Sequence, residues 1–232
     1  MMLEECTYFP SWWPRIYRHI ASLLGIDPRR DEEATILASR RLTSYGKDFQ
    51  ENLSLARKLV FGKDVAVIGA HESFLCNDVK EDVIIAADGA LNGLVMYKNI
   101  IPDIVVTDFD GASRSLLARY KPLVFAHVHG DNLKVYINSV PDIVDVLIPT
   151  TQTFPYPPFY NFGGFTDGDR AVSTALALGA KRVHLYGFQR DSVGAFSGRT
   201  NPRKKMIKLE IAFKIIDALR EIYGSEVIVL EG

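Results

Sequence analysis

The sequence predicts an α/β fold: a mostly parallel, Rossmann-like sheet flanked by helices, preceded by an N-terminal helical extension. From residue 61 onward, short β-branched runs alternate with helical patterns, and a repeated strand-then-helix order favours parallel strands. The runs are nearly continuous in apolar residues, as in strands that are buried on both faces. Before residue 61 the periodicity is only helical. We therefore expect a helical extension over residues 1–60 and an α/β domain over residues 61–232.

The N-terminal extension is predicted from apolar residues at helical spacing. A first pattern covers residues 12–24 and is broken at Asp27-Pro28, because the residue before a proline disfavours helix. A second pattern covers about residues 31–59. We expect these helices to cover one end of the main domain. The aromatic residues of the first pattern suit either core packing or a ligand wall, and core packing is the commoner use.

Seven strands and five later helical patterns are expected in the α/β domain. The strands are 65–68, 83–87, 104–107, 123–126, 146–148, 183–186 and 227–230. The helical patterns are 90–98, 115–120, 132–139, 169–178 and 202–223. One long irregular stretch, 149–167, is rich in proline and aromatic residues, and a loop of that length usually forms a lid or a binding segment.

Composition limits the classes of protein and partner. The 232 residues are 47% hydrophobic and 24% charged, which suits a full core and not a disordered chain. A net charge of −1 gives no case for a nucleic-acid partner, and the basic stretch 199–208 is typical of a solvated helix face. Cys6 and Cys76 form no CxxC pair, which argues against a disulfide framework and a structural zinc site. Without a signal peptide or an apolar span, we expect a cytoplasmic protein with no membrane partner.

Polar residues follow the ends of the predicted strands. In an open parallel sheet, ligands bind beyond the carboxyl ends of the strands. The stretches in question are 69–73, 88–90, 107–111, 127–132 and 163–169. We therefore expect the functional site at this edge of the sheet.

Asp108 and Asp110 form the sharpest pair. Residues two apart at a strand end point the same way, so both carboxylates can face one ion while Phe109 packs on the opposite side. Paired carboxylates suit Mg²⁺, which prefers oxygen ligands and binds substrate phosphates. The alternative is that this Asp-Gly segment only makes a turn and caps a helix.

Asp88 and the stretch 163–169 also have two interpretations each. Asp88 either caps the helix that follows or binds ligand hydroxyls or a metal-bound water. The glycine-rich stretch opens a helix, so its N–H groups could cradle phosphates, although it lacks the Lys-Ser/Thr ending of a P-loop. Thr166, Asp167 and Asp169 could instead serve a metal or hydroxyls, or Asp167 or Asp169 could cap the helix.

His127 and His129 flank one residue and precede Asp131. No third ligand of a zinc site is evident. One of the two histidines could act as a general base or a phosphate donor, and the alternative is a structural role, as for His71 and His184.

Three segments in a fixed order carry a resemblance to a known family. They read DGALN at 88–92, PDIVVTDFD at 102–110 and FTD at 165–167. This order resembles thiamin pyrophosphokinase, with its ADGGAN, PDxxxGDFDS and later TD. It is more similar to the archaeal 6-hydroxymethyl-7,8-dihydropterin pyrophosphokinases of the same superfamily, which also carry HGDN, here 129–132, and a Gly-Phe segment, here 187–188. The resemblance covers about residues 60–232, and the N-terminal helices share it less specifically.

The departures from the thiamin pattern also matter. One glycine of ADGGAN is missing at Ala90, and Thr107 replaces the glycine before DFD. Both differences argue against thiamin as the substrate. Gln189 stands where an aspartate is expected, and we assign it no role. Three alternatives stay open. The acceptor could be thiamin, or the chain could be a nucleotide-binding module without turnover. It could also be a glycosyltransferase-like enzyme that uses a sugar nucleotide, because related domains occur in such enzymes.

The resemblance implies an ATP-dependent diphosphotransferase of pterin or folate-type biosynthesis that acts on 6-hydroxymethyl-7,8-dihydropterin, releases AMP and uses Mg²⁺. It places the metal on Asp88, Asp108 and Asp110. Catalysis would fall to Asp108, Asp110, Asp131 and Asp167. Substrate or nucleotide binding would fall to Asp88, Gly89, Thr107, His129, Asn132, Gly163, Gly164, Thr166 and Arg170. Arg170 or a lysine within 203–208 would neutralise phosphate, and the aromatic wall for the pterin would come from Phe154, Tyr156, Phe159 and Tyr160. The partners would be ATP and the pterin, and the sequence leaves open whether the chain forms a homodimer.

Overall fold

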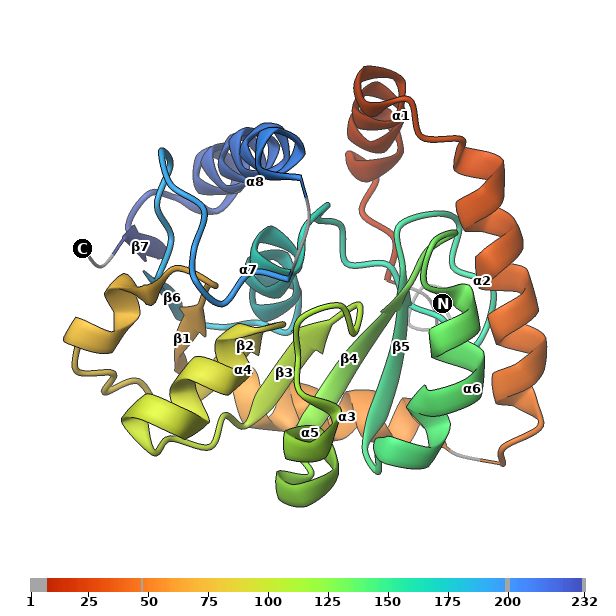
Figure 1. The fold of residues 1–232 in the computed structure, drawn as a ribbon, viewed down its shortest axis with the longest axis horizontal. Coiled ribbons are helices and arrows are strands. Elements are labelled where there is room, and N and C mark those ends of the chain that lie inside the picture. Colours follow the sequence, from red (N-terminus) through yellow and green to blue (C-terminus); the bar gives the residue numbers. More distant parts are fainter. Residues whose placement is uncertain (1–7, 47, 199–200, 231–232) are drawn as a thin grey trace.

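A seven-stranded sheet forms the centre of the molecule, and all its strands run parallel (Figure 1). This computed structural model describes residues 8–46, 48–198 and 201–230. The strand order is β5-β4-β3-β2-β1-β6-β7. The strands are β1 (Asp64–Ile68), β2 (Val83–Ala87), β3 (Ile104–Thr107), β4 (Leu123–Val128), β5 (Leu147–Thr151), β6 (Arg182–Tyr186) and β7 (Ile228–Leu230). The predicted α/β class and parallel sheet are confirmed.

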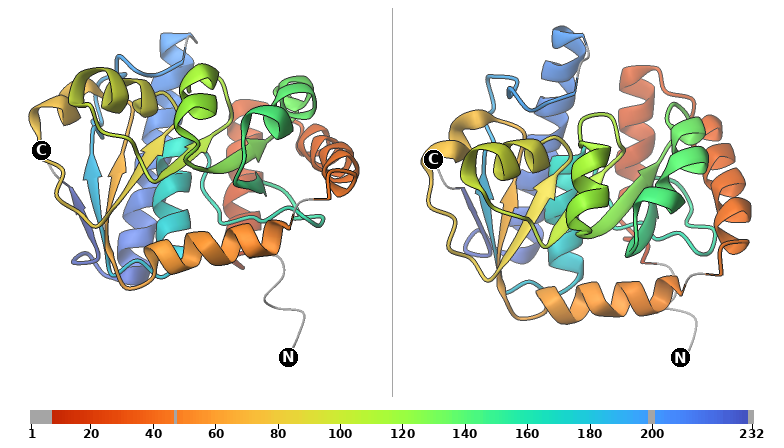
Figure 2. Two further views of the ribbon diagram at one scale, coloured as in Figure 1. Left: turned by 90° about the horizontal axis from the view of Figure 1, so that it is seen from below. Right: turned by 60° about the horizontal axis from the view of Figure 1, so that its bottom comes forward.

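Helices cover both faces of the sheet (Figure 2). One face carries α1 (Trp13–Leu24), α3 (Phe49–Val60), α7 (Asp167–Ala177) and α8 (Pro202–Tyr223). The other carries α2 (Pro28–Thr43), α4 (Ala90–Gly93), α5 (Arg114–Tyr120) and α6 (Leu133–Ile143), with a short 3₁₀ helix at Glu72–Cys76 and a π-helical turn at Leu94–Lys98. Alternate strand residues, such as Val65 and Ala66, enter opposite cores, which explains the continuous apolar runs. Among the described helices, none is long and apolar enough to cross a membrane.

The N-terminal helices pack against the β4–β5 end of the sheet, with α2 against β4 and α3 against β5. The second helical pattern of the sequence is two helices, because Asp48 caps a new one: its carboxylate accepts hydrogen bonds from the N–H groups of Gln50 (3.0 Å) and Glu51 (2.9 Å). Trp13 and Tyr17 are buried in the core and do not form a ligand wall. The division at residue 60 stays a prediction.

The irregular stretch before α7 folds back along β5. The N–H of Thr151 donates to the carbonyl of Tyr160 (3.0 Å), and the N–H of Tyr160 donates to the carbonyl of Pro149 (2.9 Å). Phe159 and Tyr160 are therefore buried. Residues 159–163 belong to the core, residues 154–158 are partly exposed, and only the two ends of the stretch reach the cavity described below.

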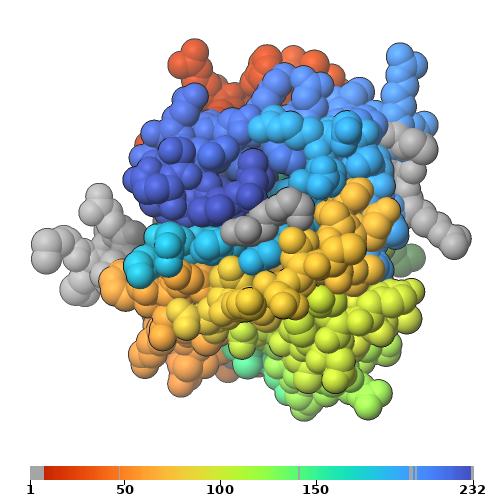
Figure 3. Space-filling view, turned by 90° about the vertical axis from the view of Figure 1, so that its left-hand side faces the viewer, coloured from red at the N-terminus to blue at the C-terminus, as the bar shows by residue number. Residues whose placement is uncertain are grey.

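The order in which the chain adds strands to the sheet switches from one side of β1 to the other. From β1 the chain proceeds through β2 to β5 on one side, and then it returns to place β6 and β7 on the other. The segments that follow β1 and β6 meet at this switch point: the N–H of His71 donates to the carbonyl of Gly187 and that of Phe196 to the carbonyl of Ala70, each at 3.1 Å. Figure 3 shows this side, with the light-blue segment after β6 beside the blue α8. A switch point is where open α/β sheets bind ligands.

Candidate active site

A cavity of about 260 Å³ lies at the carboxyl edge of the sheet. Its walls come mainly from the segments that follow the strands β1 to β6 and from α8, and Ile26 and Asp31 of the N-terminal extension complete them. It brings together most of the predicted site residues, namely Asp88, Asp108, Asp110, His129, Asp131, Thr166, Asp167 and Arg170. Gly89, Thr107, Asn132, Gly163 and Gly164 do not line it.

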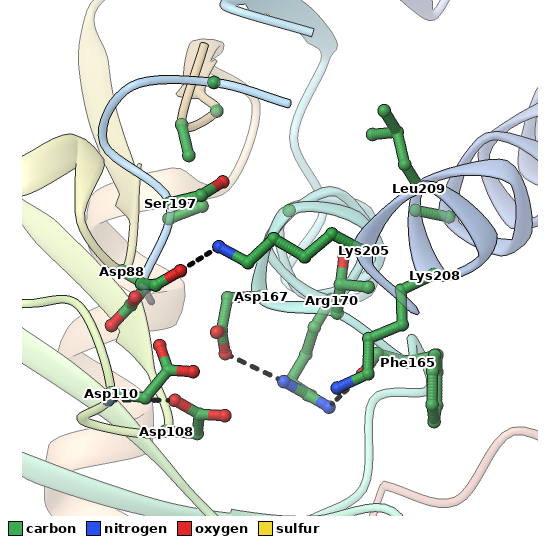
Figure 4. A pocket seen from close by; sticks show the side chains of 18 of the residues that line it. Asp88, Asp108, Asp110, Phe165, Asp167, Arg170, Ser197, Lys205, Lys208 and Leu209 are labelled. Carbon is green, nitrogen blue, oxygen red and sulfur yellow. Dashed lines mark hydrogen bonds and ion pairs between the residues drawn. The ribbon is translucent and has the colours of Figure 1, made fainter. Parts of the chain in front are cut away.

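Three carboxylates lie together on one wall of the cavity (Figure 4). Asp88 follows β2, while Asp108 and Asp110 follow β3, and one oxygen of each lies within 4.8 Å of the others. The backbone turns sharply here, since Asp88 (φ 47°) and Phe109 (φ 70°) have left-handed conformations. Phe109 thereby enters the core, which leaves the two flanking carboxylates on the cavity side.

The side chain of Asp88 braces this turn and does not cap the helix. Its Oδ1 accepts hydrogen bonds from the Thr107 hydroxyl (2.6 Å) and the N–H of Ala112 (2.9 Å), while Gly89 occupies the cap position of α4. Thr107, predicted to bind substrate, is fully buried and holds this carboxylate instead. Burial and the nearby charge of Asp108 raise the pKa of Asp88 to about 7. Oxygen donors that repel one another in this way fit Mg²⁺, which would relieve the repulsion.

Asp108 is held from two sides. Its Oδ1 accepts a hydrogen bond from the N–H of Asp110 (3.1 Å), and its Oδ2 lies 3.4 Å from Nε2 of His129. Burial raises the pKa of Asp108, but His129, the N–H of Asp110 and the charge of Arg170 outweigh burial and hold the pKa below its usual value. Asn132 joins the loops, because its amide donates to the carbonyls of Asp108 (2.9 Å) and His127 (2.7 Å).

The start of α7 frees Asp167 for the cavity. Thr166 and Asp169 form a capping box, in which Asp169 accepts hydrogen bonds from the N–H groups of Phe165 (2.6 Å) and Thr166 (2.8 Å). Asp167 instead lines the cavity and accepts a hydrogen bond from Arg170 at 2.9 Å (Figure 4). Burial, reinforced by the charge of Asp108, raises the pKa of Asp167 well above its usual value.

Glycines of the predicted site allow close packing. A Cβ on Gly163 would lie 2.6 Å from the Trp12 ring, and one on Gly164 would lie 2.4 Å from Cα of Arg170. A Cβ on Gly89 would lie 1.9 Å from the carbonyl oxygen of Phe196. These three glycines therefore shape the loops around the cavity.

Asp131 lies on the rim of the cavity. Its side chain is 79% exposed, and its Oδ1 lies 3.3 Å from the guanidinium of Arg30 in α2. It shares the carboxyl edge with Asp108 but lies apart from the carboxylate cluster. Its catalytic role stays a prediction.

The structure adds site residues that the sequence did not indicate. Asp31 of α2 and Gln152 after β5 line the cavity. A signal for Asp31 existed, because a charged residue stands on the buried face of α2 together with Ala34 and Ala38. The aromatic residues expected to meet the pterin, Phe154, Tyr156, Phe159 and Tyr160, do not line this cavity, whereas Phe165, Phe188 and Phe213 do.

Comparison with known proteins places the chain in a family. Residues 47–190 match the model of the MptE-like 6-hydroxymethylpterin diphosphokinase family. The chain belongs to this family. It is also similar to proteins named 6-hydroxymethyl-7,8-dihydropterin pyrophosphokinase. The one from Methanothermobacter thermautotrophicus is 34% identical over 220 residues, which is 89% of this chain and 93% of the relative. The one from Pyrococcus furiosus is 34% identical over 232 residues, 93% of this chain and 96% of the relative.

The family match contains the carboxylate cluster but not the whole cavity. Asp88, Asp108, Asp110, Asp167 and Arg170 lie within residues 47–190. Asp31 comes before that range, and Lys205 and Lys208 of α8 come after it. The similarity to the Pyrococcus furiosus relative covers more of the chain, 93% of it.

Proposed function

We propose that this protein transfers the diphosphoryl group of ATP to the hydroxymethyl oxygen of 6-hydroxymethyl-7,8-dihydropterin and releases AMP. The observation that carries the proposal is the cluster of Asp88, Asp108 and Asp110 in the cavity of an MptE-like family member. The names of the similar proteins support the choice of acceptor.

Asp88, Asp108 and Asp110 would hold Mg²⁺. Their oxygens are close enough to share one ion, and burial of Asp88 leaves its negative charge poorly solvated. When bound, the ion neutralises charge on the phosphate oxygens of ATP.

Basic residues face these carboxylates across the cavity. Lys205 and Lys208 extend from α8 into it (Figure 4). Burial lowers the pKa of Lys205, although the charges of Asp110 and Asp88 oppose this effect. We assign both lysines to the phosphate groups, because phosphoryl transfer depends on positioning and charge neutralisation.

The transfer forms a bond between the hydroxymethyl oxygen and the β-phosphorus, and it breaks the bond from the β-phosphorus to the α,β-bridging oxygen, which leaves with AMP. The hydroxyl proton needs an acceptor. Asp167 suits this role, because its raised pKa makes it a better base than an ordinary aspartate and because it faces the cavity beside Arg170.

Product analysis with a panel of acceptors tests the proposal. Purified protein is incubated with ATP and Mg²⁺ and either 6-hydroxymethyl-7,8-dihydropterin or thiamin, and nucleotides and acceptors are separated by chromatography. We expect one AMP for each pterin consumed and much slower turnover of thiamin. Formation of ADP with a monophosphorylated pterin would contradict diphosphoryl transfer, and equal use of thiamin would contradict the choice of acceptor.

A further inference from the structure

We divide the lining of the cavity into two arms, according to the strands that its residues follow on either side of the carboxylate cluster. Asp88 and Asp108 follow β2 and β3, which lie between β4 and β1 in the sheet. The β1–β6 arm is lined by the segments after those strands and by the start of α8, including Gly69, Gly187, Ser197 and Lys205. The β4–β5 arm is lined by Ile26, Asp31, His127 and Gln152.

The β4–β5 arm contains a buried polar atom without a partner. Nδ1 of His127 lies 3.2 Å from the hydroxyl of Thr150, but its Nε2 has no hydrogen-bond partner among the described residues. Burial, aided by the charge of Arg170, lowers the pKa of His127 and outweighs the opposing effect of the nearby Gln152 side chain, so its ring is neutral. A neutral imidazole has one donor and one acceptor nitrogen, so Nε2 takes whichever role Nδ1 leaves. Such an atom in a cavity wall is suited to a ligand.

A fixed carboxylate and amide accompany this histidine. Asp31 is buried, and its Oδ2 accepts a hydrogen bond from the amide of Gln152 at 2.6 Å. The hydroxyl of Tyr17 donates to the same oxygen, and the N–H of Gly130 donates to Oδ1 at 2.7 Å. These bonds hold Asp31 and Gln152 in one orientation before any ligand binds, which favours selective recognition.

We infer that the acceptor ring binds in the β4–β5 arm, where Asp31, His127 and Gln152 recognise its amino-oxo edge; this inference rests on the proposed function. That edge carries ring N–H and amino donors next to a carbonyl acceptor. Oδ1 of Asp31 can accept from one of these donors, because Oδ2 already accepts two hydrogen bonds, while the amide and imidazole can match either kind of group. Ile26 supplies an apolar contact, and a few polar groups in an apolar pocket are typical of small-molecule sites.

The β1–β6 arm then takes the nucleotide. It lies at the switch point of the sheet, where such folds bind ligands, and Lys205 extends into it beside Asp88 (Figure 4). The two substrates would thus approach the carboxylate cluster from opposite sides.

Two substitutions in the β4–β5 arm test this assignment. Gln152→Met and His127→Phe keep side-chain size but remove the polar atoms. Gln189→Met is the matched control, because Gln189 lines the cavity after β6, in the other arm. Calorimetry without ATP gives the Kd for 6-hydroxymethyl-7,8-dihydropterin, and AMP formation gives the KM for ATP. Thermal midpoints show whether each variant is folded.

We expect each of the two substitutions to raise the Kd for the pterin at least about 10-fold, with the KM for ATP changed less than about 2-fold. Gln189→Met should leave the Kd unchanged. Folded variants that bind the pterin as the wild type does would overturn the inference, as would an effect confined to ATP. Wild-type protein that binds the pterin without forming AMP would contradict the proposed function alone, because the Kd comparison would still decide the inference. Absence of pterin binding by the wild type would overturn the inference.

Discussion

Nε2 of His129 lies 3.4 Å from Oδ2 of Asp108, so the loop after β4 orients a carboxylate that follows β3. His129→Phe removes this contact. Because partners that orient metal ligands typically contribute about 10- to 100-fold in metal affinity, we expect the Mg²⁺ concentration for half-maximal AMP formation to rise by a similar factor. His19→Phe, on the exposed side of α1, is the control. An unchanged Mg²⁺ dependence of His129→Phe would show that the contact has no such role.

Asp108→Asn and Asp110→Asn should each reduce kcat more than about 100-fold, since loss of a ligand should exceed the effect of losing an orienting partner. The thermal midpoint should stay within a few degrees, because both side chains face the cavity and not the apolar core. Asp145→Asn is the control; this residue pairs with the exposed Lys121 at the opposite end of the sheet. Near wild-type kcat in either variant at saturating Mg²⁺ would refute its assigned role.

The pKa of Asp88 predicts how stability depends on pH in the absence of metal. Its folded value of about 7 exceeds the ordinary 3.8. The contribution of protonated Asp88 to the free energy of unfolding is therefore fully present below pH 3.8 and is lost as the pH rises through 7. Between pH 5 and 8, the thermal midpoint of the wild type should therefore fall relative to that of Asp88→Asn, and Mg²⁺ should offset the fall at pH 8. If the thermal midpoints of the two proteins changed in parallel with pH, the raised pKa of Asp88 would be contradicted.

Gly89→Ala tests close packing beside the cluster. The backbone of Gly89 has φ −62°, which suits alanine, so the obstacle is the Phe196 carbonyl oxygen at 1.9 Å from the added Cβ. We expect a loss of about 1–3 kcal/mol in the free energy of unfolding, as for other overpacked sites. Gly168→Ala should lose less, because its nearest neighbour is the Phe188 ring at 3.1 Å, which can move. Equal stability of the two variants would argue against the close contact.

Much of the fold could be predicted because the sheet is buried on both faces. The continuous apolar runs mark the strands, and the strand-helix alternation makes them parallel. The apolar pattern predicts the ends of the strands less well. Strand β5 continues to Thr151 and pairs with the segment at Tyr160, and the sequence predicts only an irregular stretch there. Pairing between such segments depends on tertiary contacts that periodicity does not reveal.

The carboxylate cluster could be located from the sequence because strand ends share one edge in a parallel sheet. Residues that reach this edge from elsewhere could not. Asp31 enters from α2, on an N-terminal helix whose packing against β4 no local pattern indicates. Thr107 and Asn132 have suitable residue types for ligand binding, but their hydrogen bonds with Asp88 and the strand-end carbonyls occupy them.

The central claim is that the β- and γ-phosphoryl groups of ATP move together. ATP labelled at the β-phosphorus, incubated with the protein, Mg²⁺ and 6-hydroxymethyl-7,8-dihydropterin, decides it directly. Diphosphoryl transfer places the label in the pterin product and leaves AMP unlabelled. Recovery of the label only in ADP would contradict the claim, because the γ-phosphoryl group alone would then have moved.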